Sequence, residues 1–506
     1  MRRFATVAGG LFIALAVASV DAGTAGAAIA QTPGRVAPAS QTASAQQAVG
    51  VRLASSVRLA AKPKKKKKKK AKKRKRYYVK QGARFNLPTG NTQQAGAIDL
   101  YLKKLIRHAP KGSEIDVSLF RLQTAGMAKE LVRAQKRKVK VRIVLDSDSL
   151  NSRPGVYNYL KRHLGADTRK PSWVLLCGKN RGCIAPSVQG QWSKNHNKFY
   201  AFSHTYDSRK VVVQTSGNAT GGMYNQYNDA YTATGKLYDA YRRYFYDLAK
   251  RRPNPDYWRT STYGNRAVSH FPKASGDPVA DILDRVRCTP GTKIRLSSGM
   301  FTRYGVASRL FKLDEAGCEV RIVSGSLGES TTKALTKPHG KNNGPDVHYF
   351  VGAQPKRAHS KYLLIQGTYQ GRYRRLVFTG SHSYTVDALR HNDESMLTLD
   401  ERATFDAYMR NFDSVFAAAK GKLTGSPLAQ PKPVDDDAKD DDGEAPPTTP
   451  TTPTTPTTPP PAPTPTETAT PTTPDEGLPP STGDPDASLP DVDVDGPPDA
   501  DGTTPQ

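Results

Sequence analysis

Two stretches of the chain, 179 residues apart, share the same order of apolar and polar positions. Residues 112–118 (GSEIDVS) match residues 291–297 (GTKIRLS), and residues 141–144 (VRIV) match residues 320–323 (VRIV) at the same offset. Apolar positions with a period of two are typical of strands, and those between the paired segments recur at helical spacing. Each copy therefore predicts a strand, a helix and a second strand, which is a parallel βαβ unit.

The same order of elements continues to the end of each copy. Apolar runs at residues 199–202 and 362–365 predict a further strand, and residues 238–245 and 405–412 share the spacing of an amphipathic helix. Repetition of this length indicates a duplicated architecture. We therefore expect an α/β core made by tandem duplication.

The expected halves of this core are residues 77–265 and residues 266–422. The first half has sixteen extra residues ahead of its candidate catalytic motif, and this insertion contains Cys177 and Cys183. We expect the insertion to lie at the rim of the site and to shape the substrate pocket.

The two ends of the chain do not have the composition of a folded domain. Residues 1–30 combine a basic start, a short apolar run and small residues, which predicts a secretory signal peptide. The apolar run is too short for a membrane span. Residues 31–76 and the acidic, Thr/Pro-rich residues 423–506 predict disordered segments. We expect a secreted, extracellular protein, and association with the cell wall stays open.

A basic run stands directly ahead of the core. From Lys62 to Arg76, thirteen of the fifteen residues are Lys or Arg, in a chain with a formal net charge of +31. One interpretation is a flexible, solvated tail. The interpretation that we favour is a tether to an anionic surface or polyanion, such as nucleic acid, anionic lipid or cell-wall polymer. The charge alone does not separate lipid from nucleic acid.

All four cysteines lie inside the core. In an exported protein an even number predicts disulfides. The local pair Cys177–Cys183 and the longer pair Cys288–Cys318 are the expected partners. A zinc site is the alternative, but the spacing does not fit paired Cys-x-x-Cys ligands.

Each half also carries a His and a Lys two residues apart, immediately ahead of an apolar run. These are His196 with Lys198, and His359 with Lys361. Side chains at i and i+2 of a strand point to the same face, so each pair projects together. The lysines can neutralise a phosphodiester, while one imidazole attacks phosphorus and the other protonates the leaving group. We therefore take the two pairs as the active site.

A small polar turn and a carboxylate follow each motif. Asn218 ends the first turn, and Ser381 and Ser383 lie in the second. Such turns expose hydroxyl, amide and backbone N–H groups to an anion. Asp229 and Glu394 stand eleven residues after Asn218 and Ser383, and a carboxylate there can hold an imidazole Nδ1–H.

These parts resemble the phospholipase D superfamily, whose signature is His-x-Lys-x4-Asp, a Gly-Ser-x-Asn-like turn and a Glu, present twice. The resemblance covers the core and neither end. It implies that two α/β/α sandwich halves form one pseudo-twofold active site. It also implies a phosphohistidine intermediate and no metal or other cofactor. Carried over to this chain, His196 and His359 act on phosphorus and on the leaving group. Lys198, Lys361, Asn218, Ser381 and Ser383 bind phosphate, while Asp229 and Glu394 orient the rings.

Three positions depart from the family pattern. The motif Asp is replaced by Ser203 in the first half and by Gln366 in the second, and Ser383 stands where Asn is usual. In this family the Asp is largely a structural salt-bridge partner, and the tyrosyl-DNA phosphodiesterase branch lacks it in both halves. The departures therefore bear on the subfamily more than on activity.

Two further residues test this interpretation. His339 begins a string that matches the full family motif, but its Gly/Asn/Pro-rich surroundings predict a loop without a strand. Trp192, just before the first motif, is expected at the core or rim, and a role in substrate stacking is the alternative.

Three classes of function remain open, and we rank them in order. The first is a secreted phospholipase D that hydrolyses phospholipid head groups of the phosphatidylcholine type, acting as a monomer. The second is a secreted endonuclease-like phosphodiesterase, which suits the basic core. The third is a catalytically inactive protein that binds a polyanion or the cell wall, favoured only if the motif departures mark a dead site.

Overall fold

Alternating apolar side chains build a seven-stranded mixed sheet in the first half of the core. The computed structural model describes residues 75–191, 193–336, 344–351 and 356–423. In sheet order the strands are β1 (Gly82–Phe85), β9 (Asp229–Thr234), β7 (Ser208–Thr215), β6 (Lys198–Thr205), β2 (Glu114–Leu119), β3 (Lys140–Leu145) and β4 (Trp173–Leu176). The helices of this half are α1 (Thr92–Ala95), α2 (Ala97–Arg107), α3 (Ala125–Lys136), α4 (Asp148–Ser152), α5 (Pro154–Leu164), α6 (Gly222–Asn225) and α7 (Lys236–Lys250).

A ten-stranded sheet forms the second half. In sheet order its strands are β10 (Arg259–Tyr263), β11 (Arg266–His270), β20 (Ser395–Asp400), β18 (Arg372–Gly380), β17 (Tyr362–Tyr369), β13 (Lys293–Phe301), β14 (Glu319–Leu327), β15 (Asp346–Tyr349) and β21 (Gly421–Lys422), with β12 (Val286–Arg287) beside β17. The helices are α8 (Pro278–Asp284), α9 (Tyr304–Glu315), α10 (Glu329–Leu335), α11 (Val386–Arg390) and α12 (Arg402–Ala418).

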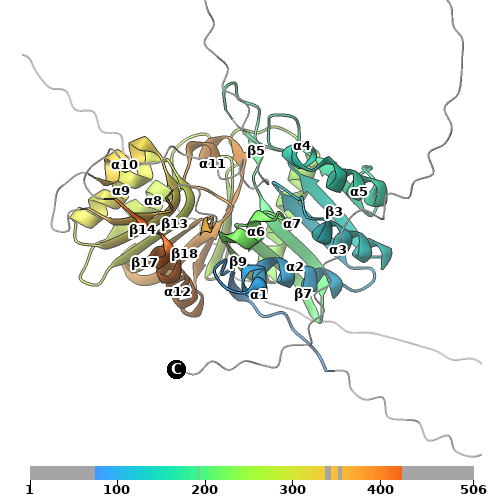
Figure 1. Cartoon of the computed structure of the whole chain (residues 1–506), viewed down its shortest axis with the longest axis horizontal. Coiled ribbons are helices and arrows are strands. Elements are labelled where there is room, and N and C mark those ends of the chain that lie inside the picture. The colour runs from blue at the N-terminus through green and yellow to red at the C-terminus, as the bar shows by residue number, and fades with distance from the viewer. Residues whose placement is uncertain (1–74, 192, 337–343, 352–355, 424–506) are drawn as a thin grey trace, which may run out of the picture. The chain divides into compact units, whose positions relative to one another are not determined.

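Six strands follow the same order and directions in both sheets. The order β9-β7-β6-β2-β3-β4 in the first sheet corresponds to β20-β18-β17-β13-β14-β15 in the second. β2 and β3 are parallel neighbours joined by α3, and β13 and β14 are parallel neighbours joined by α9 (Figure 1). The predicted α/β class and the predicted βαβ unit of each half are therefore confirmed.

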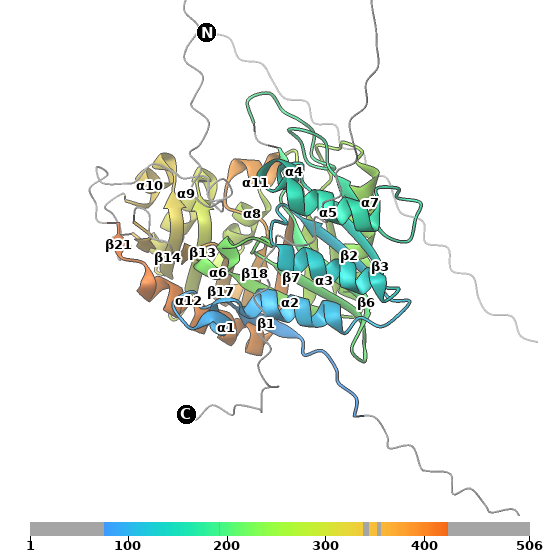
Figure 2. The same cartoon turned by 45° about the vertical axis from the view of Figure 1, so that its right-hand side comes forward.

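Helices cover both faces of each sheet, because successive strand residues face opposite sides. In β6, Tyr200 and Phe202 pack with α2, α3 and α5 on one face, whereas Phe199 packs with α7 on the other. Figure 2 shows α2, α3 and α5 along one face of the first sheet. The cluster around α7 also contains α12 and residues of β17 such as Leu364. A single central apolar layer is thus shared by the two halves, and α8, α9 and α10 pack on the far face of the second sheet.

Two short strand pairs connect the halves directly. β5 (Lys194–Asn195) pairs with β19 (Asn392–Asp393), and β16 (Arg357–Ala358) pairs with β8 (Gln226–Tyr227), both in parallel. β5 and β16 are the residues immediately ahead of the two His-x-Lys motifs. Each motif is therefore held by a strand of the opposite half.

Both predicted disulfides are present. Cys177 and Cys183 close a loop with a sequence separation of 6 and a Cα–Cα distance of 4.6 Å. Cys288 and Cys318 have a sequence separation of 30 and a Cα–Cα distance of 5.1 Å. Cys318 lies just ahead of β14 and Cys288 follows β12, so the longer disulfide lies at the start of the parallel strands.

The Cys288–Cys318 disulfide is expected to stabilise the core by about 3 to 4 kcal/mol, because closing a loop of this length restricts the unfolded chain. We expect the Cys288→Ser/Cys318→Ser variant to lose that amount of unfolding free energy, measured by urea denaturation at equilibrium. An unchanged denaturation midpoint would contradict this expectation.

Several sequence predictions concern residues outside the described ranges. These are the signal peptide at residues 1–30, the basic run up to residue 74, Trp192, His339 and the tail from residue 424. The expected boundaries of the two halves also stay predictions. Within the described ranges, no helix has the length and apolar character needed to cross a membrane.

Candidate active site

The first His-x-Lys motif stands where β5 leads into β6. The strand begins at Lys198, so the motif enters the sheet at the point where the apolar alternation starts. His196 is 1% exposed and Lys198 is 0% exposed. The Lys198 Nζ atom donates a hydrogen bond to the backbone oxygen of His196 at 3.1 Å. A buried ammonium is costly unless negative charge lies nearby, so this position suits a group that meets an anionic substrate.

The second motif repeats this arrangement ahead of β17. His359 and Lys361 are 1% and 3% exposed. The Lys361 Nζ atom donates to the backbone oxygen of His359 at 2.6 Å. The backbone N–H of His359 donates to Tyr227 of the first half, just as that of His196 donates to Asp393 of the second. The two motifs therefore enter the interface of the halves in equivalent ways.

Each imidazole is held by a residue of the opposite half. Nδ1 of His196 lies 2.7 Å from Oε1 of Glu394, and Nδ1 of His359 lies 2.8 Å from Oδ1 of Asn228. An Nδ1–H that donates to oxygen leaves the Nε2 lone pair to act as nucleophile or base. With Nδ1–H donated in this way, each ring carries either a lone pair or a transferable proton on Nε2. The pair is asymmetric, because one partner is a carboxylate and the other is an amide.

The prediction that Asp229 orients an imidazole is wrong. Its Oδ2 atom instead accepts hydrogen bonds from Thr379 Oγ1 at 2.5 Å and from Tyr408 Oη at 2.8 Å. Asn228, the preceding residue, faces the ring, because neighbouring residues in an extended chain point to opposite sides. Asp229 therefore stabilises the contact between the halves behind the site.

A one-residue difference in spacing explains the error. Ser216 exchanges hydrogen bonds with Asp229, and Ser381 exchanges the same bonds with Ser395. The first pair is 13 residues apart and the second pair is 14 residues apart. Asp229 thus corresponds to Ser395, and Asn228 is the counterpart of Glu394.

The predicted phosphate-binding residues leave the sheets at the same edge where the motifs enter. Phe199 pairs with Gln214, so the end of β7, which leads to Asn218, lies beside the start of β6. Tyr362 pairs with Thr379 in the same way, which brings Ser381 and Ser383 to the Lys361 edge. Asn218 and Ser381 are buried, and Ser383 is half-buried. The Ser381 hydroxyl accepts the backbone N–H of Ser395 at 3.1 Å, so it also supports the turn.

Residues at the family's Asp positions have local structural roles. The hydroxyl of Ser203 accepts the backbone N–H of Glu114 at 2.8 Å, which links the far end of β6 to β2. Gln366 lies in mid-strand between Lys293 and Arg375. Neither position adjoins the imidazoles, so their substitution leaves the described arrangement of the motifs intact.

Phe120, which the sequence interpretation missed, forms an aromatic wall beside the first motif. Its ring centroid lies 5.4 Å from that of His196 and 5.4 Å from Lys198 Nζ. Lys194 Nζ lies 4.9 Å from the same ring. Attraction between ammonium groups and an aromatic face helps to hold these cations near the imidazole. The position of Phe120, immediately after the parallel strand β2, was the available signal in the sequence.

His382 lies inside the second turn but has a structural environment. Its ring stacks on Phe271 at a centroid distance of 4.1 Å, and its Nε2 atom faces the Arg303 guanidinium at 3.2 Å. Burial and the positive charge of Arg303 hold the pKa of His382 well below its usual range. A neutral His382 adds no positive charge beside His196.

A cavity of about 750 Å³ adjoins Phe120. Its other walls include Asn180, Gln189, Gln191 and Lys194, at or just after the insertion of the first half. The insertion therefore contributes to the wall of this cavity, and its role in shaping a substrate pocket stays a prediction.

Together, the described residues form a two-part α/β structure with paired His and Lys residues at the contact of the parts. Residues 288–416 match the family model described as "Cardiolipin synthase, PLD-like domain". This match includes His359, Lys361 and Glu394, so the second half of the core is similar to a PLD-like domain. No curated protein matches the chain.

Solved structures with low sequence identity resemble the chain. Polyphosphate kinase from Porphyromonas gingivalis is 12% identical with a TM-score of 0.48, over 68% of this chain and 49% of the kinase. This chain thus spans about half the length of that enzyme. Phosphatidylserine synthase from Haemophilus influenzae is 14% identical with a TM-score of 0.46, over 68% of this chain and 87% of the synthase. Nuc from Salmonella typhimurium, a phospholipase D family member, is 18% identical with a TM-score of 0.25, over 33% of this chain and 99% of Nuc.

Proposed function

We propose that the chain is a secreted, metal-independent phosphodiesterase that hydrolyses phospholipid head groups of the phosphatidylcholine type through a phosphohistidine. The observation that carries this proposal is the crossed pairing of His196 with Glu394 and of His359 with Asn228 at the contact of the halves. Two buried lysines beside these rings supply positive charge for the phosphate.

In the first step, the Nε2 atom of His196 attacks phosphorus. An N–P bond forms while the P–O bond to the leaving alcohol breaks, and His359, which enters this step as an imidazolium with protons on both ring nitrogens, gives its Nε2 proton to that alcohol. Lys198 and Lys361 hold the non-bridging oxygens, whose charge becomes more exposed in the transition state. In the second step, His359 takes a proton from water, whose oxygen attacks phosphorus. The N–P bond then breaks and His196 is restored.

His196 is the better candidate for the nucleophile because Glu394 is its partner. A phosphorylated imidazole carries a positive charge while its Nδ1 keeps a proton, and a carboxylate at 2.7 Å stabilises that charge. The amide of Asn228 fixes the tautomer of His359 without adding charge. His359 can therefore release and regain its proton more readily, as a general acid and base must.

An endonuclease-like phosphodiesterase remains the second candidate because the formal net charge of +31 suits a polyphosphate backbone as well as an anionic lipid surface. The deciding experiment is an assay of the purified mature protein on phosphatidylcholine vesicles and on DNA, with His196→Ala as the control. Release of choline that is absent in the control supports the lipid substrate, whereas cleavage of DNA alone would favour the second candidate. No turnover of either substrate, with tight binding to polyanions, would support an inactive binding protein.

EDTA is expected to leave the activity on a soluble phosphodiester unchanged, because Lys198 and Lys361 supply the charge that a metal ion would otherwise provide. The measurement is the initial rate before and after dialysis against EDTA. Loss of the rate, with recovery on adding a divalent cation, would contradict the proposed chemistry.

Deletion of residues 62–76 is expected to raise KM on anionic vesicles and to flatten the salt dependence, while kcat stays nearly unchanged. The proposed role of this basic run is to concentrate the protein on an anionic surface or polyanion, where many contacts add up. A small soluble phosphodiester should be cleaved equally by both forms. If the deletion lowered kcat on the small substrate, the run would have to reach the active site.

A further inference from the structure

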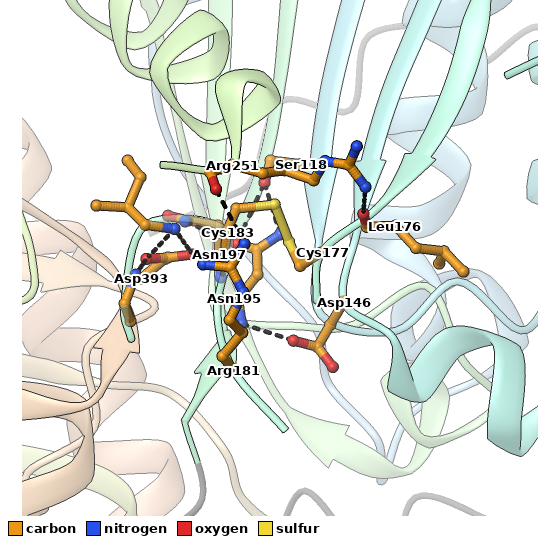
Figure 3. Close-up of a disulfide and its surroundings, with 12 residues drawn as sticks. Ser118, Asp146, Leu176, Cys177, Arg181, Cys183, Asn195, Asn197, Arg251 and Asp393 are labelled. Atoms are coloured by element: carbon orange, nitrogen blue, oxygen red, sulfur yellow. Dashed lines mark hydrogen bonds between the residues drawn. A yellow bond between two sulfur atoms is a disulfide. The ribbon is translucent and has the colours of Figure 1, made fainter. Parts of the chain in front are cut away.

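The last residue of the loop closed by the Cys177–Cys183 disulfide, together with the two residues that follow it, holds a carboxylate of the opposite half (Figure 3). We call residues 177–185 the disulfide loop. The backbone N–H groups of Cys183 and Ala185 each donate to Asp393 at 2.6 Å, and that of Ile184 donates to the same carboxylate at 3.2 Å. Asp393 is 0% exposed. Three consecutive amides thus replace water around one buried carboxylate.

Asp393 is also the residue next to Glu394, the partner of His196. Its backbone oxygen accepts the N–H of His196 at 3.0 Å, and its strand β19 pairs with β5 ahead of the motif. The contacts therefore run without a gap from the disulfide loop, through Asp393, to Glu394 and to the ring of His196.

The loop is itself anchored on the first half. The backbone oxygen of Ile184 accepts the N–H of Asn254 at 2.8 Å, and the Arg181 side chain donates to the backbone oxygen of Arg251 at 2.9 Å. Figure 3 shows Arg181, Arg251 and Asp393 gathered around the disulfide. These two anchors and the disulfide hold the amides in one geometry, so Asp393 has little freedom to move.

A carboxylate at this position is costly, which indicates that it has a role. Burial raises the pKa of Asp393 to about 7, although the three amides favour the charged form. The other half has Tyr227 in the equivalent place, where its backbone oxygen accepts the N–H of His359. Asp393 and the insertion therefore occur together. Both lie beside His196, whose imidazole has the carboxylate of Glu394 as its partner.

We propose that Asp393 is a positioning residue, and that the disulfide loop is a backbone clamp that holds Asp393 and thereby aims Glu394 at His196. The inference rests on the proposed function, because it concerns the ring assigned as the nucleophile. An asparagine could not replace Asp393, since its NH₂ group would face N–H donors.

The first test measures kcat and KM of the Asp393→Asn variant on a soluble phosphodiester. We expect kcat to fall by about 10- to 100-fold, the usual cost of losing a supporting partner, with little change in KM. In a Glu394→Gln background the Asp393→Asn substitution should lower kcat by a much smaller factor, because its effect passes through Glu394. An unchanged kcat, or an equal loss in both backgrounds, would overturn the proposal.

The second test removes the disulfide instead of the carboxylate. Cys177→Ser/Cys183→Ser should lower kcat several-fold, whereas Cys288→Ser/Cys318→Ser should lower the melting temperature and leave kcat unchanged. The second pair is a matched control because it lies at the Lys293 end of β13, where the strand pairs with Gln366, away from the motif. Equal kcat values in the two double variants would overturn the clamp.

A readout independent of activity separates this proposal from the proposed function. The His196 Nδ1–H proton, held by Glu394, should give an NMR resonance that shifts or broadens in Asp393→Asn and persists in the Cys288→Ser/Cys318→Ser control. If the wild-type protein showed no turnover, the proposed function would fail while this resonance still tested the clamp. A resonance identical in Asp393→Asn and wild type would overturn the clamp itself.

Discussion

Substitution of His196 or of His359 by alanine is expected to lower kcat by at least about four orders of magnitude, since loss of a catalytic group that works in a unit has effects of this size or larger. His196→Ala removes the atom that bonds to phosphorus, and His359→Ala removes the proton donor for an alkoxide leaving group. The measurement is the steady-state rate on a lipid or alkyl phosphodiester, with folding checked by thermal denaturation.

Two other histidines serve as controls for this result. His163, whose Nδ1 atom contacts the backbone oxygen of Tyr159 in α5, lies away from both motifs and should tolerate alanine. His339 should tolerate it as well, although its surrounding string matches the family motif in full. Retained turnover in His196→Ala or in His359→Ala would contradict a site that uses one ring from each half.

Alanine at Lys198 or at Lys361 is expected to reduce kcat by about 10²- to 10³-fold, the usual effect of removing one group that stabilises transition-state charge. Both ammonium groups are buried within hydrogen-bond distance of the backbone of their own motif histidine. In the proposed mechanism they approach the phosphate from both halves. The measurement is kcat on a soluble diester, for which surface binding plays no part.

Lys210 provides the matched control for this prediction. It is exposed and forms an ion pair with Asp239 at 2.9 Å, so Lys210→Ala removes one positive charge without touching the site. If kcat were unchanged in Lys210→Ala and much lower in Lys198→Ala, the loss of activity would come from the missing positive charge at the site. Equal losses in the two variants would instead indicate an effect of net charge or stability.

Much of the fold could be predicted from the sequence because its determinants are local and occur twice. The strand periodicity of residues 112–118 and of residues 291–297 predicted β2 and β13. The even number of cysteines, four in the whole chain, predicted two disulfides, and both expected pairs are present. The His-x-Lys pairs were visible because their spacing matches the two-residue period of a strand.

The partners of the imidazoles could not be predicted in full, because they come from the opposite half. Counting eleven residues from each turn selected Asp229 and Glu394, but the second turn is one residue longer than the first. A shift of one residue in an extended chain turns the neighbouring side chain toward the ring, so Asn228 occupies the position expected for Asp229. The contact of Asp393 with the disulfide loop joins residues more than 200 apart, and no local pattern records it.

The most direct test of the phosphohistidine chemistry uses a p-nitrophenyl phosphodiester with the His359→Ala variant. p-Nitrophenolate leaves without a proton donor, so the first step proceeds, whereas the second step lacks its general base. The account predicts a burst of one p-nitrophenolate per enzyme molecule, with the phosphoryl group found on His196 by mass spectrometry after rapid quenching. His196→Ala should give no burst. A His359→Ala enzyme without a burst, or a phosphoryl group on any other residue, would contradict the account.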